Sequence, residues 1–315
     1  MGITASSVPV LLMVFNRPHE TRKVFNIIRT VEPKFLYIAA DGPRRGGEQD
    51  KAMVQSVRDI IAQVDWDCEV QTLLRNENLG CRVAVSSAID WFFKHEEAGI
   101  ILEDDCLPNL DFFPYCEELL RRYRQDDRVM MISGTTFYNG QGVIPYSYYF
   151  SRYHHIWGWA TWRRAWKYYN GCMQRWPDVR DSGEFQQMIL NNTYSEKLKR
   201  AQFLCWRKLF DKVYSDETLP WDALWIFACW LNNGLTVVPV RNMVSNIGFG
   251  DAATHTCFGG SEVSCLKTYK MRFPLKHPPV YFQNRRADIL IQRVFFRIGL
   301  QIKLFDRVGR WQSRM

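Results

Sequence analysis

Short apolar runs alternate with amphipathic stretches over the first hundred residues, and this alternation limits the possible folds more than any other feature. The apolar runs predict strands at residues 8–15, 35–40, 68–74 and 99–102, and the stretches between them predict helices at 20–31, 48–64 and 82–95. This order is typical of βαβ units, which build a mainly parallel sheet. The sequence therefore predicts an α/β fold, with a Rossmann-like sheet and helices on both of its faces.

After residue 105 the pattern becomes less regular. Helices are expected at residues 110–124, 184–213 and 222–231, and strands at 128–133 and 235–240. Residues 137–169 are aromatic and show no clear period, so they are expected to be irregular. The second part of the chain is therefore predicted to differ in character from the first.

Each of the first four predicted strands ends in polar or charged residues. These are Asn16 with Arg17, then Asp41, then Arg75, and last Glu103, Asp104 and Asp105. Open α/β sheets bind ligands at the carboxyl edge, where parallel strands end together. An arginine near a helix N-terminus suits a diphosphate, and Asp41 could accept hydrogen bonds from a base or a ribose. The four endings predict a ligand site at this edge.

The acidic triplet Glu103-Asp104-Asp105 directly follows the apolar run Ile100-Ile101-Leu102. Burying an ionised carboxylate is costly unless a cation or strong donors meet it. Mg²⁺ and Mn²⁺ prefer oxygen ligands and often take only one or two protein carboxylates, with water and phosphate in the other positions. The triplet thus suits a divalent metal that carries phosphate. Taken alone, it fits a solvated acidic turn equally well.

Glycine-rich phosphate-binding motifs are absent. The sequence has no Gly-x-Gly-x-x-Gly and no Gly-x-x-x-x-Gly-Lys-Ser/Thr after any predicted strand. Nicotinamide-dependent and P-loop enzymes use these motifs to hold phosphates, so both classes lose support.

The segment Trp157-Gly158-Trp159 is the second strong feature. Two indoles separated by a glycine would form a rigid aromatic wall on which a sugar can stack, and Gly158 would let backbone donors approach the ligand. A core loop between the two indoles is the alternative. The preceding pair His154-His155 is not expected to ligate one metal, because adjacent strand residues point to opposite faces.

Two later segments complete the candidate site. Asp222 stands where an apolar helix should begin, and a carboxylate held there beside a cleft could act as general base for an acceptor hydroxyl. A helix-capping role fits Asp222 equally well. Phe249 lies between two glycines, in a loop expected to fold over a ligand, and His255 could contact phosphate or metal. A solvated surface loop is the alternative for that segment.

The nine cysteines are odd in number and scattered, and no Cys-x-x-Cys pair is present. This pattern favours reduced thiols in the cytoplasm over a disulfide framework or a zinc site. The N-terminal residues lack the basic-then-apolar layout of a signal peptide, and no apolar segment is long enough to span a bilayer. A cytoplasmic location is therefore expected.

The net charge is +8, and residues 285–314 supply most of the excess, with eight basic residues against two acidic ones. Apolar residues recur there at helical spacing, which predicts a basic amphipathic helix. Such a helix either packs on the domain as a terminal helix or makes peripheral contact with an anionic membrane through residues 285–315. Nucleic acid is not an expected partner, because the basic excess is confined to the tail and no nucleic-acid module accompanies it.

Together these motifs resemble the GT-A glycosyltransferases, and more narrowly the N-acetylglucosaminyltransferase I type and the bacterial family-2-like sugar transferases. The resemblance extends over roughly residues 8–257. It rests on Asn16-Arg17, Asp41-Gly42, Arg75 with Asn78-Leu79-Gly80, Ile101-Leu102-Glu103-Asp104-Asp105, Trp157-Gly158-Trp159, Trp221-Asp222, and the loop Asn246-Ile247-Gly248-Phe249-Gly250 running on to His255. The acidic triplet and this late loop are its more specific parts.

The resemblance implies roles for the residues at the strand ends. Arg17, Asp41 and Arg75 match positions that hold the uracil, ribose and phosphates of the nucleotide. Asp105 matches the last carboxylate of a DxD-like motif, which ligates the manganese that bridges the diphosphate. The same resemblance places Asp104 at the ribose or sugar and Glu103 beside the donor sugar.

The resemblance also implies an inverting reaction, with Asp222 as its base. The family motif Trp-Asp-Asp reads Trp221-Asp222-Ala223 here, which is a departure by one carboxylate. The loop around Phe249 would close over the bound donor.

The sequence thus predicts a glycosyltransferase of polysaccharide biosynthesis that uses Mn²⁺ or Mg²⁺. It would move a sugar from a nucleotide-diphosphate sugar, with UDP as the expected nucleotide, to a hydroxyl of a glycan or lipid-linked acceptor. The expected parts are a donor-binding half at 1–105, an acceptor-binding and catalytic half at 106–260, and a C-terminal extension with the basic helix at 261–315.

Two other functions stay open at this point. A sugar nucleotidyltransferase would share the α/β layout and the metal-phosphate chemistry, although the chain lacks a glycine-rich, lysine-bearing loop after its first strand. A non-catalytic glycan-binding protein would keep the aromatic residues without the chemistry.

Overall fold

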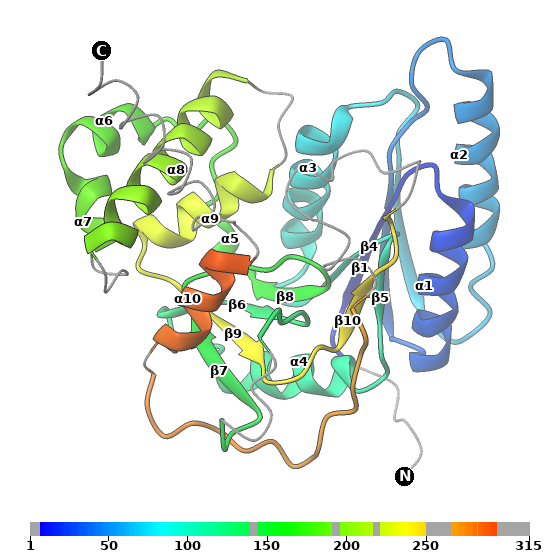
Figure 1. The fold of residues 1–315 in the computed structure, drawn as a ribbon. Coiled ribbons are helices and arrows are strands. Elements are labelled where there is room, and N and C mark those ends of the chain that lie inside the picture. The colour runs from blue at the N-terminus through cyan, green and yellow to red at the C-terminus, as the bar shows by residue number, and fades with distance from the viewer. Residues whose placement is uncertain are drawn as a thin grey trace.

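A mixed eight-stranded sheet with helices on both faces organises the chain (Figure 1). The computed structural model describes residues 7–138, 144–190, 196–216, 221–249, 266–281 and 283–294. The strands of the large sheet are β1 (Val10–Val14), β2 (Phe35–Ala40), β3 (Glu69–Leu74), β4 (Ala98–Glu103), β6 (Val129–Ser133), β7 (Tyr148–Ser151), β8 (Trp159–Trp162) and β9 (Leu235–Pro239). Their order across the sheet is β3-β2-β1-β4-β8-β6-β9-β7.

The first four strands are parallel neighbours, as the sequence predicts. Hydrogen bonding pairs Val14 with Ala40 and Ala40 with Leu74, while Met13 pairs with Glu103. The carboxyl ends of β1, β2, β3 and β4 are therefore level to within about one residue. The helices that connect these strands are α1 (Pro18–Val31), α2 (Glu48–Ile61) and α3 (Gly80–His95), close to their predicted bounds.

The other half of the sheet is mixed rather than parallel. Strand β8 runs antiparallel to both of its neighbours, β4 and β6, and β7 runs antiparallel to β9, whereas β6 and β9 are parallel. The expectation that residues 137–169 are irregular is wrong for β7 and β8. Every residue of these two strands is buried, so their sequences show no alternation of apolar and polar residues.

A second, two-stranded sheet lies at the end of β4. It pairs β5 (Cys106–Pro108) antiparallel with β10 (Val244–Asn246), and Asn246 stands opposite Cys106. Neither strand was predicted, because three residues are too few to show a period. This small sheet joins the chain directly after the acidic triplet to a segment about 140 residues later in the sequence.

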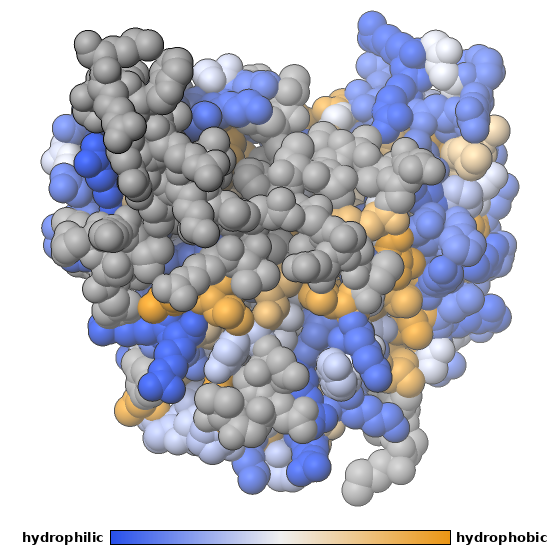
Figure 2. All heavy atoms as spheres, in the orientation of Figure 1, coloured by the Kyte–Doolittle hydropathy of each residue, from blue (hydrophilic) through white to orange (hydrophobic). Residues whose placement is uncertain are grey.

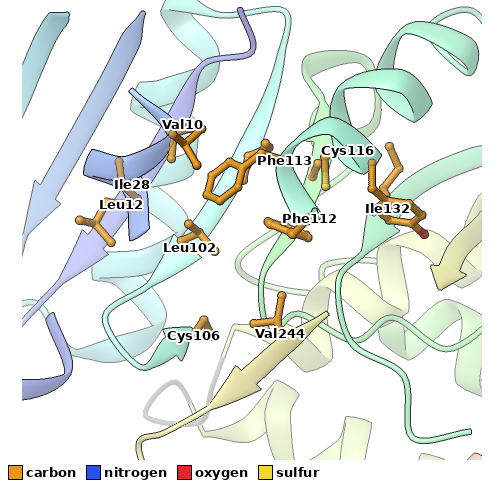
Figure 3. Packing of buried hydrophobic residues seen from close by; sticks show 14 of the residues in the cluster. Val10, Leu12, Ile28, Leu102, Cys106, Phe112, Phe113, Cys116, Ile132 and Val244 are labelled. Carbon is orange, nitrogen blue, oxygen red and sulfur yellow. The ribbon is translucent and has the colours of Figure 1, made fainter. Parts of the chain in front are cut away.

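Two hydrophobic cores cover the two faces of the large sheet. Helices α1, α2 and α4 (Phe112–Arg122) pack on one face. Figure 3 shows Val10, Leu12 and Leu102 of this core together with Ile28 and Phe113. Helices α3, α5 (Arg163–Trp166) and α9 (Asp222–Leu231) pack on the other face. Figure 2 shows the outward surfaces of α1 and α2 as largely hydrophilic, which is the expected pattern of amphipathic helices.

A third core holds a group of helices at the end of the molecule farthest from α1 and α2 (Figure 1). Its helices are α6 (Trp176–Asp181), α7 (Glu184–Leu190), α8 (Glu196–Ser215) and α9. Eight of the twelve tryptophans are at most 4% exposed and lie in the three cores, namely Trp159, Trp162, Trp166, Trp176, Trp206, Trp221, Trp225 and Trp230. Burial of one such side chain stabilises a fold by about 2–3 kcal/mol, so the high tryptophan content serves mainly the core.

The predicted boundary at residue 105 does not coincide with a break in the large sheet, and the one at 260 lies outside the described residues. Strand β8 lies between β4 and β6, so the predicted donor and acceptor halves share one sheet. Whether the two halves have the separate functions expected of them stays a prediction. Within the described part of the chain, no helix combines the length and the apolar character needed to cross a membrane.

Helix α10 (Arg285–Val294) is the described part of the predicted basic helix, and it packs on the protein at its start. Ala287, Asp288 and Ile291 are buried, while Arg285 and Arg286 are exposed. The carboxylate of Asp288 accepts hydrogen bonds from Ser151 Oγ at 2.5 Å and from the Arg152 backbone N–H at 3.4 Å, and from the Gln283 amide. The alternative of a packed terminal helix therefore holds for this part. Residues 295–315 lie outside the described residues, and membrane contact stays a prediction.

Asp288 predicts a measurable pH dependence of stability. Burial raises its pKa to about 6, although the hydrogen bond from Ser151 opposes the shift. A raised pKa means that the folded protein holds the proton of Asp288 more tightly than the unfolded chain does. The contribution of Asp288 to the free energy of unfolding is therefore largest below pH about 4 and is lost as the pH rises through about 6. Asp288→Asn stays neutral at every pH. The unfolding free energy of the wild type minus that of Asp288→Asn should fall by up to about 3 kcal/mol between these pH values.

Urea unfolding of both proteins at several pH values from 4 to 7 measures this difference. Titrating groups that do not contact Asp288 change the free energy of unfolding of both proteins equally, so their effects cancel in the difference. A difference that stays constant across this range would show that Asp288 titrates normally in the folded protein.

Candidate functional site

The acidic triplet lies where β4 ends and turns into β5. Glu103 is the last residue of β4, and Asp104 and Asp105 form the turn that precedes Cys106. The backbone N–H of Phe15, at the end of β1, donates to Asp104 Oδ2 at 3.1 Å. The side chains of Asp104 and Asp105 are only 10% and 17% exposed, so the alternative of a solvated acidic turn does not describe them.

Arg17 supplies the cation that meets these carboxylates. It directly precedes α1, and its Nη1 donates to Asp105 Oδ2 at 2.6 Å and lies 3.8 Å from Asp104 Oδ1. Its side chain is 18% exposed. The level strand ends explain this contact, because residues following β1 and β4 emerge side by side in adjacent parallel strands. The structure thus brings together Arg17 and the triplet, which the sequence placed in one site.

The two faces of β4 divide the triplet. Ile101 belongs to the core under α3 and α9, and Leu102 belongs to the core under α1 and α4. Strand side chains alternate between faces, so Glu103 is directed toward the α3 and α9 side. Asp104, held by the end of β1, lies on the α1 side with Arg17.

The carboxylates perturb one another strongly. Burial raises the pKa of Glu103 well above its usual range, and Asp105, Asp104 and Asp222 raise it further. Burial also raises the pKa of Asp104 to about 7, with Asp105 adding to the shift and Arg17 opposing it. The charges of the triplet and of Asp222 thus influence one another, and Arg17 is the cation that acts on the triplet.

Asp222 reaches this group from the other half of the chain. It is the first residue of α9, and its Oδ1 accepts a hydrogen bond from the Ala223 backbone N–H at 2.9 Å. The preceding Trp221 is 1% exposed and stacks on Trp159, with ring centroids 5.7 Å apart and an interplanar angle of 23°. Asp222 begins a helix, as predicted. The buried indole of Trp221 fixes where that helix starts.

Cys81 is a member of the site that the sequence interpretation missed. It is the second residue of α3, and burial raises the pKa of its thiol to about 12, with Glu103, Asp222 and Asp105 adding to the shift. The thiol therefore lies among the same carboxylates and stays protonated. Its proximity depends on how α3 crosses the sheet, and no sequence motif around Cys81 could have shown it.

Asp41 holds the end of β2 to the turn before α3. Its Oδ1 accepts hydrogen bonds from the backbone N–H groups of Gly42 and Leu79, and its Oδ2 accepts one from the Asn78 amide at 2.9 Å. Burial raises the pKa of Asp41, and the bonds from Leu79 and Gly42 lower it again. The predicted contact of Asp41 with a ribose stays a prediction.

Arg75 and Asn16 are also held by neighbouring elements. Arg75 Nη2 donates to Ser87 Oγ of α3 at 2.8 Å. Burial lowers the pKa of Arg75, and Asp41 opposes the shift. Asn16 Nδ2 donates to Asp50 Oδ1 in the first turn of α2 at 2.5 Å. Of the polar residues at the first three strand ends, Arg17 is therefore the one that contacts the triplet.

The segment after β10 lies directly over the pair Arg17–Asp105. The backbone N–H of Ile247 donates to the Asp105 carbonyl at 2.8 Å. A Cβ placed on Gly248 would lie 2.1 Å from Asp105 Oδ2 and 2.7 Å from Arg17 Nη1. Only a glycine lets the backbone approach the two charged groups this closely. Residues 246–249 thus lie over the strand ends; that the loop closes over a ligand stays a prediction, and His255 lies outside the described residues.

Of the predicted aromatic wall, Trp157 is accessible and Trp159 is not. Trp157 is partly exposed, and the rings of Phe249 and Phe137 meet it edge to face at centroid distances of 5.6 Å and 5.4 Å. Trp159 is 0% exposed and packs against Trp221, so the prediction that a sugar stacks on it is wrong. Trp159 belongs to β8, in which every residue is buried. The sequence of β8 does not alternate between apolar and polar residues, so it did not indicate this burial.

Gly158 serves packing in the described structure. Its φ is +62°, a conformation that favours glycine, and an added Cβ would lie 2.7 Å from Val244 of β10. The nearby His154 and His155 are buried, and burial lowers the pKa of each imidazole to about 3. Both histidines are therefore neutral at physiological pH. The core-loop alternative describes this segment, apart from Trp157.

Carboxylate oxygens are of the type that Mg²⁺ and Mn²⁺ prefer, and Asp105 would be the residue to hold such an ion. The Asp105 carboxylate already meets a cation, the Arg17 guanidinium, and further carboxylates lie close by. Among the described residues, no three His, Cys, Asp or Glu side chains are grouped to enclose a metal by themselves. Mg²⁺ and Mn²⁺ sites often contain only one or two carboxylates, and water and phosphate complete them.

Comparisons with known proteins leave the function to be argued from this geometry. No family model and no curated protein sequence matches the chain. Among solved structures, HddC from Yersinia pseudotuberculosis is similar at 10% identity and a TM-score of 0.29, over 50% of this chain and 77% of that one. A UDP-glucose pyrophosphorylase complexed with UDP-glucose is similar at 12% identity and a TM-score of 0.24, over 46% of this chain and 62% of that one. Neither likeness is strong enough to decide a function.

Gly248→Ala should loosen the loop over the site. The added methyl group cannot fit against Asp105 Oδ2 at 2.1 Å, so the backbone must move and the bond from the Ile247 N–H should weaken. Hydrogen–deuterium exchange at the Ile247 amide should become at least about tenfold faster. The free energy of unfolding should fall by about 1–3 kcal/mol.

Gly171→Ala is the matched control, because a Cβ at Gly171 would meet no atom within 4 Å. It should leave the Ile247 amide as protected as in the wild type. Unchanged exchange in Gly248→Ala would mean that the loop does not lie on the carboxylates in solution.

Proposed function

We propose that the protein is a metal-dependent glycosyltransferase. It moves a sugar from a nucleotide-diphosphate sugar, with UDP as the nucleotide, to a hydroxyl of a glycan or lipid-linked acceptor. One observation carries the proposal: Arg17 from the end of β1, the triplet from the end of β4 and Asp222 from the start of α9 converge on one site. Such a site has groups for a diphosphate on one side and a carboxylate base on the other.

The α1 side of the site suits the leaving group. Transfer of a sugar breaks the bond between the anomeric carbon and the diphosphate, on which negative charge then grows. A divalent metal held by Asp105 would neutralise that charge. Arg17, beside Asp105, can donate two parallel hydrogen bonds to phosphate oxygens. The backbone from residue 247 to 249 covers this side and would limit the access of water.

The α3 and α9 side suits the acceptor. Asp222 is fixed at the start of α9, on the side toward which Glu103 is directed. There Asp222 would accept the proton of the attacking hydroxyl. Attack from the side opposite the diphosphate inverts the anomeric centre. The departure from the family motif at Ala223 leaves Asp222 as the carboxylate at the start of the helix.

Glu103 and the exposed aromatic rings would contact the sugar. Glu103 lies close enough to Asp105 and Asp222 for both charges to act on it, so we place the transferred sugar beside Glu103. Its raised pKa favours a protonated carboxyl, which can donate a hydrogen bond to a sugar hydroxyl. Trp157 and Phe249 are partly exposed and in contact with each other, and their rings could stack against the sugar.

Nucleotide binding should depend on both the metal and Asp105. Calorimetric titration with UDP should show binding in the presence of Mn²⁺, and at least about tenfold weaker binding in its absence or in Asp105→Ala. Asp127→Ala is the control, since that carboxylate is 91% exposed and pairs with Arg164 on the surface. Failure of every nucleotide and nucleotide sugar to bind with Mn²⁺ present would exclude a transferase and leave the glycan-binding function.

Asp222→Asn should separate binding from chemistry. The amide keeps the shape and the contact at the start of α9 but cannot take a proton, so the transfer rate should fall by about 10²–10⁴-fold. UDP binding should stay within about twofold of the wild type. Unchanged turnover would move the base to another residue. Release of pyrophosphate from a nucleoside triphosphate and a sugar phosphate would instead identify a nucleotidyltransferase.

A further inference from the structure

The contact between Arg17 and Asp105 occupies one of the two carboxylate oxygens that a metal could bind. Arg17 Nη1 lies 2.6 Å from Asp105 Oδ2, and the other oxygen, Oδ1, is approached by the Cys106 thiol at 3.5 Å. Both charged side chains are less than one fifth exposed. A cation arriving from solvent therefore finds the Asp105 carboxylate already paired and shielded.

The backbone at Gly248 covers one side of this pair. A single added carbon there would lie 2.1 Å from Asp105 Oδ2 and 2.7 Å from Arg17 Nη1. The backbone at Gly248 therefore lies in close contact with both charged groups. A divalent ion also repels the guanidinium at such distances. The ion and the guanidinium thus cannot share Asp105 Oδ2 in this arrangement.

We propose that Arg17 is a gate on the metal site of Asp105, an inference that rests on the proposed function. In the free protein the guanidinium holds Asp105 and keeps the affinity for the metal alone low. A nucleoside diphosphate opens the gate, because its phosphate oxygens attract the same guanidinium and its negative charge favours the incoming metal. Metal and nucleotide therefore bind together, and Arg17 changes its partner from Asp105 to the diphosphate.

The gate predicts that removal of the guanidinium strengthens metal binding in the absence of nucleotide. Titration with Mn²⁺ alone, followed by the electron paramagnetic resonance signal of the free ion, should show at least about tenfold tighter binding to Arg17→Met than to the wild type. The gain should vanish when Asp105→Ala is added to Arg17→Met. Affinity for UDP should fall in Arg17→Met, because the diphosphate loses a partner.

Arg22→Met is the matched control, as it removes another arginine of the same α1 region. Arg22 Nη1 donates to Gln63 Oε1 and makes no described contact with the triplet. This variant should bind Mn²⁺ as the wild type does. If Arg17→Met does not fold, as judged by circular dichroism, Arg17→Gln takes its place, because its neutral amide can still donate to Asp105.

The outcomes separate the gate from the proposed function. Equal or weaker Mn²⁺ binding in the Arg17 variants, with UDP and Mn²⁺ still binding the wild type together, would overturn the gate and leave the transferase proposal intact. No Mn²⁺ binding to the wild type or the Arg17 variants, with or without UDP, would overturn the proposed metal-dependent function. An equal gain in Arg22→Met would also overturn the gate, since it would show a general effect of charge.

Discussion

The level ends of four parallel strands are the constraint on which the candidate site depends. Hydrogen bonding between β3, β2, β1 and β4 sets their register, so Arg75, Asp41, Arg17 and the triplet emerge at one edge. Strand side chains alternate, and a slip of β4 by one residue would exchange the faces of Glu103 and Asp104. The separation of the proposed phosphate side near α1 from the proposed acceptor side near α3 and α9 depends on this register.

The buried carboxylates at this edge need hydrogen bonds from the surrounding backbone. Carboxylates that lie close together and partly out of water repel one another, and Arg17 offsets only part of that repulsion. Backbone groups contribute the rest of the support, as when the Phe15 N–H meets Asp104 and the Asp105 carbonyl accepts from Ile247. The small sheet of β5 and β10 holds these groups in place.

The aromatic half of the chain positions the proposed base rather than the sugar. Trp221 stacks on Trp159 and also meets Trp166, so the start of α9 is anchored in the core of the sheet. Asp222 follows this anchor directly and can hardly move relative to β4. The rings that stay partly exposed, Trp157 and Phe249, lie next to the loop over Asp105. Most of the tryptophans thus act on function indirectly, through the rigidity of the core.

The sequence by itself determined the α/β class, the first four strands with their helices, and the polar residues at the strand ends. These features are local: periods of two and 3.6 residues, and the order of elements along the chain, are visible without a partner. The same local view placed Asp222 at a helix start and identified the triplet. It could not distinguish a buried aromatic strand from an irregular loop, because β7 and β8 bury every residue and show no alternation.

Only the tertiary structure decided which of these residues meet. The antiparallel insertion of β8 between β4 and β6 buries Trp159 and carries the sheet into the second half of the chain. The crossing of α3 brings Cys81 to the carboxylates, and the pairing of β10 with β5 brings Gly248 onto Arg17 and Asp105. Each of these contacts joins segments far apart in the sequence. Their energies come from packing and pairing across the whole sheet, and no local pattern records them.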